Sequence, residues 1–230
     1  MGSAPSGADI IRPVKLAKDC LDVGLYTDRY DEMRGFYCEE LGLEYEELLK
    51  VGGGIHQHRL GLRGSVLKVN SSREPLDEAS TNYVGFELNG ARAQNLRDPD
   101  GTAVTVSPDI ERITVHWASS APEQLATMLR DGFDAVDAGD GRLRVGTTVL
   151  ALHPGGAPVG PARSRGFRYL TVQVRDVRAE HANLLQLGWR EWVPPRKLGE
   201  TAYISFVLDP DGSPIEISQR ASLTGPLPDV

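Results

Sequence analysis

A ten-residue pattern occurs twice in the chain, and it constrains the fold more than any other feature. Residues 98–107 and 209–218 both begin with Asp-Pro-Asp-Gly and continue as a short, mostly apolar segment. Proline fixes φ within such a turn, and glycine supplies the positive φ that follows. Alternation then places Ile215 and Ile217 on one face of the second segment and Glu216 on the other. A tight turn that leads into a half-buried strand is therefore predicted at both places.

Two looser copies of this pattern lie elsewhere in the chain. Residues 64–70 and 146–152 keep the glycine and the apolar segment but lack Asp-Pro. Four related strands indicate an internal repeat. The position four residues after each glycine is occupied by Lys68, Thr105, Leu150 and Glu216. The frame repeats while its polar residue changes, which predicts one differentiated site on a duplicated scaffold.

Length, charge and cysteine content limit the classes of protein that remain. A chain of 230 residues allows one large domain or two smaller ones. A net charge of −7 without a basic run argues against nucleic acid and anionic membranes as partners. The N-terminus lacks the apolar core of a signal peptide, and Cys20 and Cys38 form no CxxC motif. We therefore expect a cytoplasmic protein with free thiols.

The order of predicted elements repeats along the chain. Met33, Phe36, Tyr37 and Leu41 recur at helical spacing and predict a helix from Tyr30 to about Leu41. This helix follows a strand at 21–27 and precedes strands near 44–51, 55–60 and 65–70. The second unit, from 83 to 107, has little room for a helix. The third opens at 112–117 with a helix that begins at Ser120 or Pro122, and the fourth opens at 169–174 with a helix capped by Asp176.

This order resembles that of a known superfamily. The resemblance is carried by Phe36-Tyr37 with Leu41-Gly42-Leu43, by Val172-Gln173-Val174-Arg175-Asp176, and by Asp209-Pro210-Asp211-Gly212 with Ile215-Glu216. Together these segments resemble the vicinal oxygen chelate superfamily, which includes glyoxalase I, extradiol dioxygenases and bleomycin-resistance proteins. The resemblance implies an α+β fold of four tandem βαβββ modules, the second degenerate, that form two half-barrel glyoxalase-like domains.

The resemblance also implies a division of the chain into domains. Modules 1 and 2 would form an N-terminal domain over residues 14–109, and modules 3 and 4 a C-terminal domain over residues 110–220. Residues 1–13 would be a flexible N-terminal tail, and residues 221–230 a C-terminal tail that packs on the surface or is disordered. A monomer or a homodimer would fit this organisation.

In metal-using relatives, ligands come from the first strand of each paired module and from a carboxylate on a last strand. Glu216 matches that carboxylate position. The first-strand position, usually His or Gln, falls on Tyr169 in the fourth module, on Leu21 or Asp22 in the first, and on Thr114 in the third, with His116 on the same face. The resemblance thus implies one divalent ion (Fe, Mn, Zn, Ni or Co) held by Glu216 and His116, or no metal.

Six residues are candidates for the functional site. Glu216 is a candidate general base, and His116 and Tyr169 are candidate acids or bases. Gln173, on the strand face of Tyr169, is a candidate substrate-binding residue, as are His58 and Lys68. A solvated edge strand explains the alternation at His58 better than a binding role does, and an exposed strand glutamate is the alternative for Glu216.

Two classes of function fit these residues. One is an isomerase- or lyase-like enzyme that acts on an oxygen-rich metabolite, with Glu216 as metal ligand or general base. The other is a metal-free protein that binds or sequesters a drug or natural product. A dioxygenase is a third alternative. A small molecule is the expected partner in each case, and fold alone does not choose among them.

Overall fold

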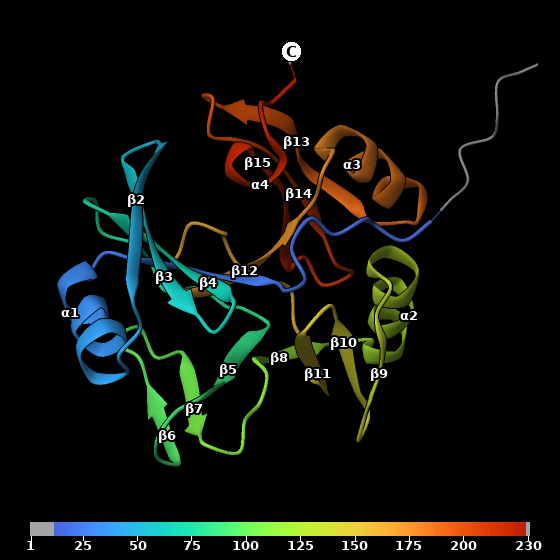
Figure 1. The fold of residues 1–230 in the computed structure, drawn as a ribbon. Coiled ribbons are helices and arrows are strands. Elements are labelled where there is room, and N and C mark those ends of the chain that lie inside the picture. Colours follow the sequence, from blue (N-terminus) through green and yellow to red (C-terminus); the bar gives the residue numbers. More distant parts are fainter. Residues whose placement is uncertain (1–11, 229–230) are drawn as a thin grey trace, which may run out of the picture.

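A computed structural model describes residues 12–228 of the chain, which form two mixed sheets (Figure 1). The first module contains β1 (Asp22–Thr27), α1 (Tyr30–Arg34), the π-helix η1 (Gly35–Glu40), β2 (Tyr45–Gly52), β3 (Ile55–Leu62) and β4 (Ser65–Ser72). The second contains β5 (Tyr83–Asn89), β6 (Gln94–Arg97) and β7 (Ala103–Ser107). No helix lies between β5 and β6, as predicted for this degenerate module.

The other two modules have the predicted element order. The third contains β8 (Thr114–Ser119), α2 (Pro122–Phe133), β9 (Val136–Gly139), β10 (Arg142–Val145) and β11 (Thr148–Pro154). The fourth contains β12 (Gly166–Gln173), α3 (Val177–Gln186), β13 (Arg190–Leu198), β14 (Ala202–Leu208) and β15 (Pro214–Arg220), followed by α4 (Ala221–Thr224). The Asp176 side chain accepts the Ala179 N–H at 3.1 Å and caps α3 as expected. The α+β class with tandem modules is confirmed.

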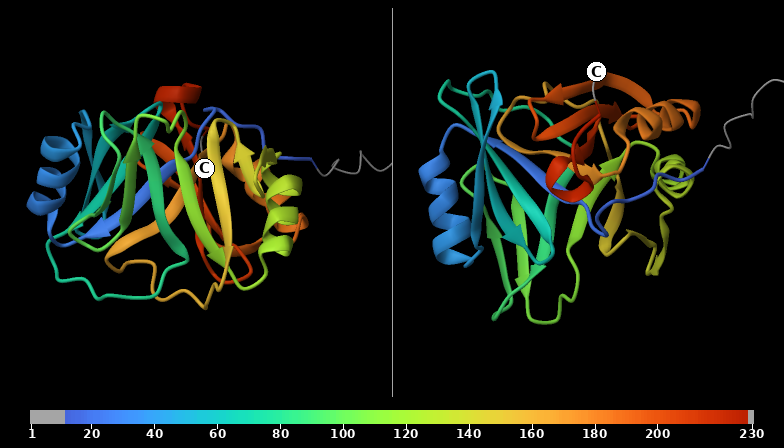
Figure 2. Two further views of the ribbon diagram at one scale, coloured as in Figure 1. Left: turned by 90° about the horizontal axis from the view of Figure 1, so that it is seen from below. Right: turned by 45° about the horizontal axis from the view of Figure 1, so that its top comes forward.

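The two sheets combine modules from different parts of the sequence. The first sheet has the order β13-β14-β15-β12-β1-β4-β3-β2, and the second has β6-β7-β5-β8-β11-β10-β9. The first module therefore shares a sheet with the fourth, and the second with the third (Figures 1 and 2). The predicted domains, residues 14–109 and 110–220, each join two consecutive modules. Each sheet instead contains one module from either predicted domain.

An antiparallel strand pair forms the centre of each sheet. In the first sheet β1 runs antiparallel to β12, with Asp22 opposite Thr171 and Gly24 opposite Tyr169. Strands β4 and β15 flank this pair, and each runs parallel to its neighbour. Side chains alternate along the strands, so Val23 and Leu25 enter the hydrophobic core while their neighbours point to the other face.

Both Asp-Pro-Asp-Gly turns form as predicted. Gly101 and Gly212 have φ of 88° and 94°, in the region that favours glycine. In each turn the aspartate Oδ1 accepts the N–H four residues later, at 2.8 Å for Asp98 and 2.6 Å for Asp209. The shared geometry supports the interpretation that these segments are copies of one repeat.

The described parts of the predicted tails contact the domain. Arg12 forms an ion pair with Glu180 of α3 at 2.9 Å, and Leu227 is buried in the core. Residues 1–11 and 229–230 of these tails lie outside the described part of the chain. Cys20 and Cys38 are free thiols, as predicted. Every helix within residues 12–228 is too short or too polar to span a membrane.

A buried arginine ties together the two long connections between modules. Arg168 on β12 donates to the carbonyls of Ala79 and Ser80 at 3.0 Å each. It also donates to the carbonyls of Gly160 at 3.2 Å and Pro161 at 2.9 Å. The first two acceptors lie between β4 and β5, and the other two between β11 and β12. Arg168 therefore holds both crossings between the sheets at one point.

Replacing this side chain should destabilise the fold. Arg168→Met removes four hydrogen bonds made by a buried, charged side chain, so we expect the free energy of unfolding to fall by about 3 kcal/mol. Urea denaturation measures this loss. The exposed Arg97 gives the matched control, because Arg97→Met removes one surface hydrogen bond to Gly101 and should change stability by less than about 0.5 kcal/mol. Equal losses in the two variants would contradict the role of Arg168.

Candidate functional site

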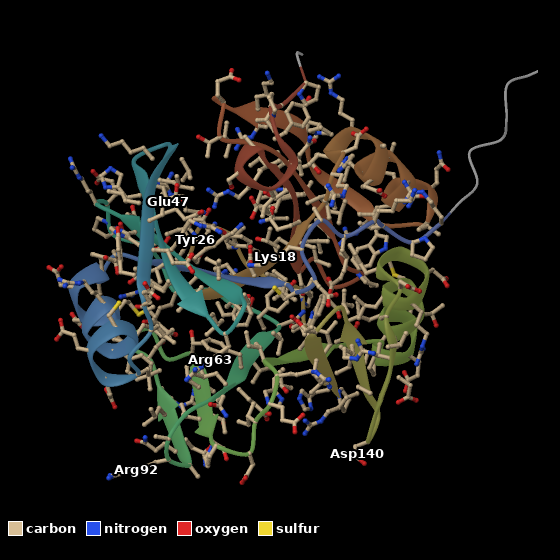
Figure 3. All side chains as sticks on the ribbon, viewed as in Figure 1. Lys18, Tyr26, Glu47, Arg63, Arg92 and Asp140 are labelled. Carbon is tan, nitrogen blue, oxygen red and sulfur yellow. The ribbon has the colours of Figure 1, made fainter. Side chains whose placement is uncertain are left out.

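The face of the eight-stranded sheet opposite Val23 and Leu25, which we call the inner face, contains a cavity of ≈ 340 Å³. Its aromatic wall is formed by Tyr26, Tyr169 and Phe206, with ring centroids 6.1 Å apart for Tyr26 and Tyr169 and 5.7 Å apart for Tyr169 and Phe206. Figure 3 shows Tyr26 between β2 and the orange-red strands of the fourth module. Glu216 reaches this cavity from β15.

Glu216 is bound to a lysine from the first module. Lys68 Nζ donates to Glu216 Oε2 at 2.6 Å and to Thr171 Oγ1 at 2.7 Å. Thr171 Oγ1 donates to the same carboxylate oxygen at 2.6 Å, which closes a triangle of hydrogen bonds. Glu216 is 6 % exposed and Lys68 is 2 % exposed. A buried ion pair of this kind is tightly constrained, because either charge alone would be very costly there.

The repeat explains why these two residues meet. Lys68 lies beside Gly24 on β1, and Glu216 lies beside Thr171 on β12. Because β1 and β12 run antiparallel, the equivalent positions of the two modules face each other across the central pair. The sequence already shows that Lys68 and Glu216 occupy the same place in the repeat. The pairing of the first module with the fourth, which the sequence analysis did not predict, brings them into contact.

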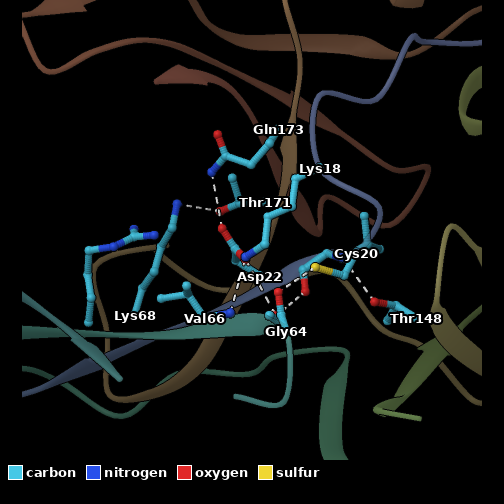
Figure 4. A network of polar contacts seen from close by, with 12 residues as sticks. Lys18, Cys20, Asp22, Gly64, Val66, Lys68, Thr148, Thr171 and Gln173 are labelled. Carbon is cyan, nitrogen blue, oxygen red and sulfur yellow. Dashed lines mark hydrogen bonds and ion pairs between the residues drawn. The ribbon is translucent and has the colours of Figure 1, made fainter. Parts of the chain in front are cut away.

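A second carboxylate lies on the other side of Lys68. Asp22 is fully buried and accepts from Lys18 Nζ at 2.8 Å, the Val66 N–H at 3.1 Å and Gln173 Nε2 at 3.1 Å (Figure 4). Burial would raise the pKa of this carboxyl, but the positive charges of Lys68 and Lys18 hold it below its usual value. Burial lowers the pKa of Lys68, while Glu216 and Asp22 oppose that shift.

The phenol of Tyr169 also belongs to this centre. Its hydroxyl accepts from Asn70 Nδ2 at 3.0 Å, and the Lys68 ammonium lies 5.7 Å from its ring centroid. Burial, with Glu216 nearby, raises the pKa of Tyr169 well above its ordinary value, so the hydroxyl stays protonated. A glycine leaves room for the ring, because a Cβ at Gly24 would lie 2.3 Å from it.

Four of the six predicted site residues are brought together. Glu216, Tyr169 and Lys68 meet at one point, and Gln173 joins them through Asp22. Sequence reasoning gave three of these side chains separate roles and did not predict the ion pair. Asp22 appeared only as one of two positions allowed by a register slip. Its contacts with Lys18, Val66 and Gln173 place it beside this centre, whereas Leu21 packs in the hydrophobic core.

His58 faces away from this cavity. Its ring stacks on Tyr30 of α1 with centroids 3.6 Å apart, and its Nδ1 and Nε2 contact Tyr45 Oη and Ser71 Oγ at 3.2 Å each. Strand β3 lies between β2 and β4, so the expected edge strand is wrong. The side chains of β3 alternate as predicted, but the face with Gln57 and Arg59 lines the cavity, not the face with His58.

His116 lies in the other sheet and does not approach Glu216. From β8 it contacts Glu87 Oε1 through Nε2 at 2.8 Å, and His153 Nε2 through Nδ1 at 2.8 Å. The hypothesis that His116 and Glu216 share a metal ion therefore requires two residues that the fold separates. The cause is again module pairing, because the third module joins the second rather than the fourth.

Comparisons with known proteins identify this architecture. Residues 129–217 match the model of the Glyoxalase/Bleomycin resistance protein/Dioxygenase superfamily. Glyoxalase I from Zea mays superposes with a TM-score of 0.68 at 14 % identity, over 87 % of this chain and 92 % of that one. The C-terminal part of the chain thus matches this superfamily model, and the described chain shares the fold of glyoxalase I.

Two more solved structures share this fold. A "putative dioxygenase" from Bacillus subtilis superposes with a TM-score of 0.64 at 12 % identity, over 91 % of this chain and 86 % of that one. The cppA protein of Streptococcus pneumoniae gives a TM-score of 0.54 at 9 % identity, over 89 % and 99 %. No curated protein sequence matches the chain. At these identities the structures share the fold and leave the chemistry open.

The residues at this centre do not fit a divalent metal ion. Vicinal oxygen chelate proteins often use such an ion, but here the Lys68 ammonium occupies the space beside the Glu216 carboxylate. Tyr169 stays protonated, and a neutral phenol is a poor ligand. Residues 12–228 contain no group of three or more His, Cys, Asp or Glu side chains placed to hold a metal. The Lys68 ammonium therefore occupies the position beside Glu216 where a metal ion was expected.

A double-mutant cycle tests this ion pair. Lys68→Met and Glu216→Leu each leave a buried charge without its partner, so each should lower the free energy of unfolding by about 3–5 kcal/mol. The double variant removes both charges and should be clearly more stable than the sum of the single losses predicts. Urea denaturation of all four proteins measures the coupling. Additive losses would mean that Lys68 and Glu216 do not interact.

Proposed function

We propose that this protein binds a small organic molecule in the cavity beside Glu216, and that it does so without a divalent metal ion. The observation that carries the proposal is the ion pair between Lys68 and Glu216. It neutralises the carboxylate that would otherwise attract a metal ion, and it leaves the adjoining cavity for an organic ligand. Sequestration of a drug or natural product is the corresponding biological role.

The cavity walls support a planar, partly polar ligand. A volume of ≈ 340 Å³ lies within the range of small-molecule sites. Tyr26, Tyr169 and Phe206 offer ring faces and edges for stacking. Gln57 and Asn70 add amide groups that can fix the orientation of a ligand oxygen or nitrogen. We derive no metal-dependent step from this site, and ring cleavage by a dioxygenase is not proposed.

Calorimetry with metal-free protein tests the proposal. We expect naphthalene-2-carboxamide and related planar amides to bind at one site per chain, with affinity unchanged by EDTA. Phe206→Ala removes one cavity wall and should weaken binding about tenfold, whereas Leu185→Ala, an exposed site on α3, should leave it unchanged. Binding that appears only after a divalent metal is added, or no binding by any planar compound, would refute the proposal.

A second candidate function is proton transfer by Glu216, as in an isomerase or lyase. Glu216 Oε2 accepts from Lys68 and Thr171, while its Oε1 accepts no hydrogen bond from residues 12–228. A carbon acid in the cavity could lose a proton to Oε1. The negative charge that moves onto the adjacent carbonyl oxygen would then be stabilised by the Lys68 ammonium.

Deuterium exchange distinguishes this candidate from simple binding. With protein in D₂O, a 2-oxo acid such as 2-oxobutanoate should exchange its C3 protons faster than in buffer alone, and the NMR signal should decay accordingly. Glu216→Gln lacks the base and should abolish the enhancement, while EDTA should not affect it. Exchange at the same rate with wild type and Glu216→Gln would remove Glu216 from the chemistry.

A further inference from the structure

Two buried arginines from different modules converge beyond Lys68 on the inner face of the eight-stranded sheet. Arg59 comes from β3 and is 6 % exposed, and Arg220 comes from the end of β15 and is 9 % exposed. Both side chains line a pocket of ≈ 90 Å³ that contains Lys68 and Glu216. Both also line an adjoining cavity of ≈ 400 Å³ that contains Asp22. The two guanidiniums thus lie between the two spaces and line both of them.

A single carboxylate from the rim of the sheet reaches both guanidiniums. Glu47 Oε2 lies 3.0 Å from Arg220 Nη2 and 3.7 Å from Arg59 Nε. Glu47 is on the edge strand β2 (Figure 3), and its side chain is 43 % exposed. An ion pair with so exposed a partner contributes little to stability. Glu47 can therefore be exchanged for another carboxylate at small cost, because a ligand that takes its place keeps both guanidiniums paired.

Other buried groups in the same place lack partners. Arg220 Nε and Gln173 Oε1 are both buried, and neither has a hydrogen-bond partner within residues 12–228. The hydrogen bond from Arg59 Nη1 to Gln57 Oε1 is long, at 3.5 Å. Buried polar groups are normally satisfied, so the unpaired Arg220 Nε and the weakly bonded Arg59 Nη1 indicate a place where a ligand acceptor completes the set. Gln173 Oε1 is itself an acceptor and would need a different partner.

The charges at this place favour a negatively charged ligand. The pocket of ≈ 90 Å³ is lined by four cationic side chains and one carboxylate: Lys50, Arg59, Lys68, Arg220 and Glu216. The adjoining cavity adds Lys18, Asp22, Glu46 and Glu47. Burial and the neighbouring Arg220 lower the pKa of Arg59, which reflects the strain of holding these cations together. A guanidinium binds a planar carboxylate through two parallel hydrogen bonds, so carboxylate matches this arrangement better than a neutral group.

The small pocket supplies apolar contacts for the rest of such a ligand. Leu49 and Val51 line it from the first module, and Leu198 and Ile204 from the fourth. Val51, Leu198 and Ile204 also line the aromatic cavity, so the two spaces share a wall. A ligand with an acidic head and an apolar or aromatic body can extend from the arginines toward Tyr169.

We propose that Arg59 and Arg220 form a subsite for the carboxylate of an aromatic or aliphatic organic acid, and that this carboxylate displaces Glu47. The inference deepens the proposed function and depends on it, since it names the class of ligand that the cavity takes. Glu47 is an internal competitor for the subsite, and it keeps the arginines paired when no ligand is bound.

Calorimetry with matched acids and amides tests this subsite. The probes are benzoate, cinnamate and naphthalene-2-carboxylate, each compared with its amide. In wild type each acid should bind at least tenfold more tightly than its amide, as expected for a charge-assisted, bidentate contact. Arg59→Gln and Arg220→Gln should each abolish most of this preference. Arg97→Gln, on the other sheet, serves as the control and should keep it.

Glu47→Gln gives the most specific result, because it changes only an exposed side chain. Removing the competing carboxylate should tighten acid binding severalfold and leave amide binding unchanged. A purely structural role for Glu47 predicts no gain for acids. Equal binding of acids and amides in wild type would overturn the subsite while the proposed function stands. Absence of binding by both kinds of probe would overturn the two proposals together.

Discussion

A buried ammonium requires negative charge around it, and this requirement organises the centre of the protein. The Lys68 ammonium interacts with the carboxylates of both Glu216 and Asp22. Thr171 accepts from Lys68 and donates to the Glu216 carboxylate. Satisfying that one cation involves β1, β4, β12 and β15, which are the four central strands of the larger sheet. The fold of glyoxalase-like proteins is kept, but an internal charge holds together the place where relatives can bind a metal ion.

The same logic extends outward along the inner face of the sheet. The counter-charges of these cations differ in exposure: Glu216 and Asp22 are buried, with Asp22 also paired to the partly exposed Lys18, whereas Glu47 is half-exposed against Arg59 and Arg220. Tightly held pairs stabilise the scaffold, whereas a loosely held pair can exchange its partner. The loosely held pair lies at the edge of the sheet, at β2, where the proposed ligand would enter.

Local patterns in the sequence predicted local structure well. The Asp-Pro-Asp-Gly turns, the Asp176 cap and the missing helix of the second module are determined by residues close together in the chain. Module pairing depends on contacts between strands about 150 residues apart, which periodicity does not encode. Because module pairing was not predicted correctly, His116 and Glu216 were placed at one site although they lie in different sheets. For His58, alternation gave the two faces of β3 but not which of them faces the cavity.

The joining of the first module to the fourth has a consequence for biosynthesis. Strands β1 and β4 are made early, but β12 and β15 emerge from the ribosome only after the second and third modules are complete. Until then Lys68 has no Glu216, and the larger sheet has an open edge along β1. Such long-range pairing slows folding and exposes unpaired strand edges to other chains. Truncated products that lack β15 would contain Lys68 without its counter-charge and an unpaired strand edge. Both features would favour binding by chaperones.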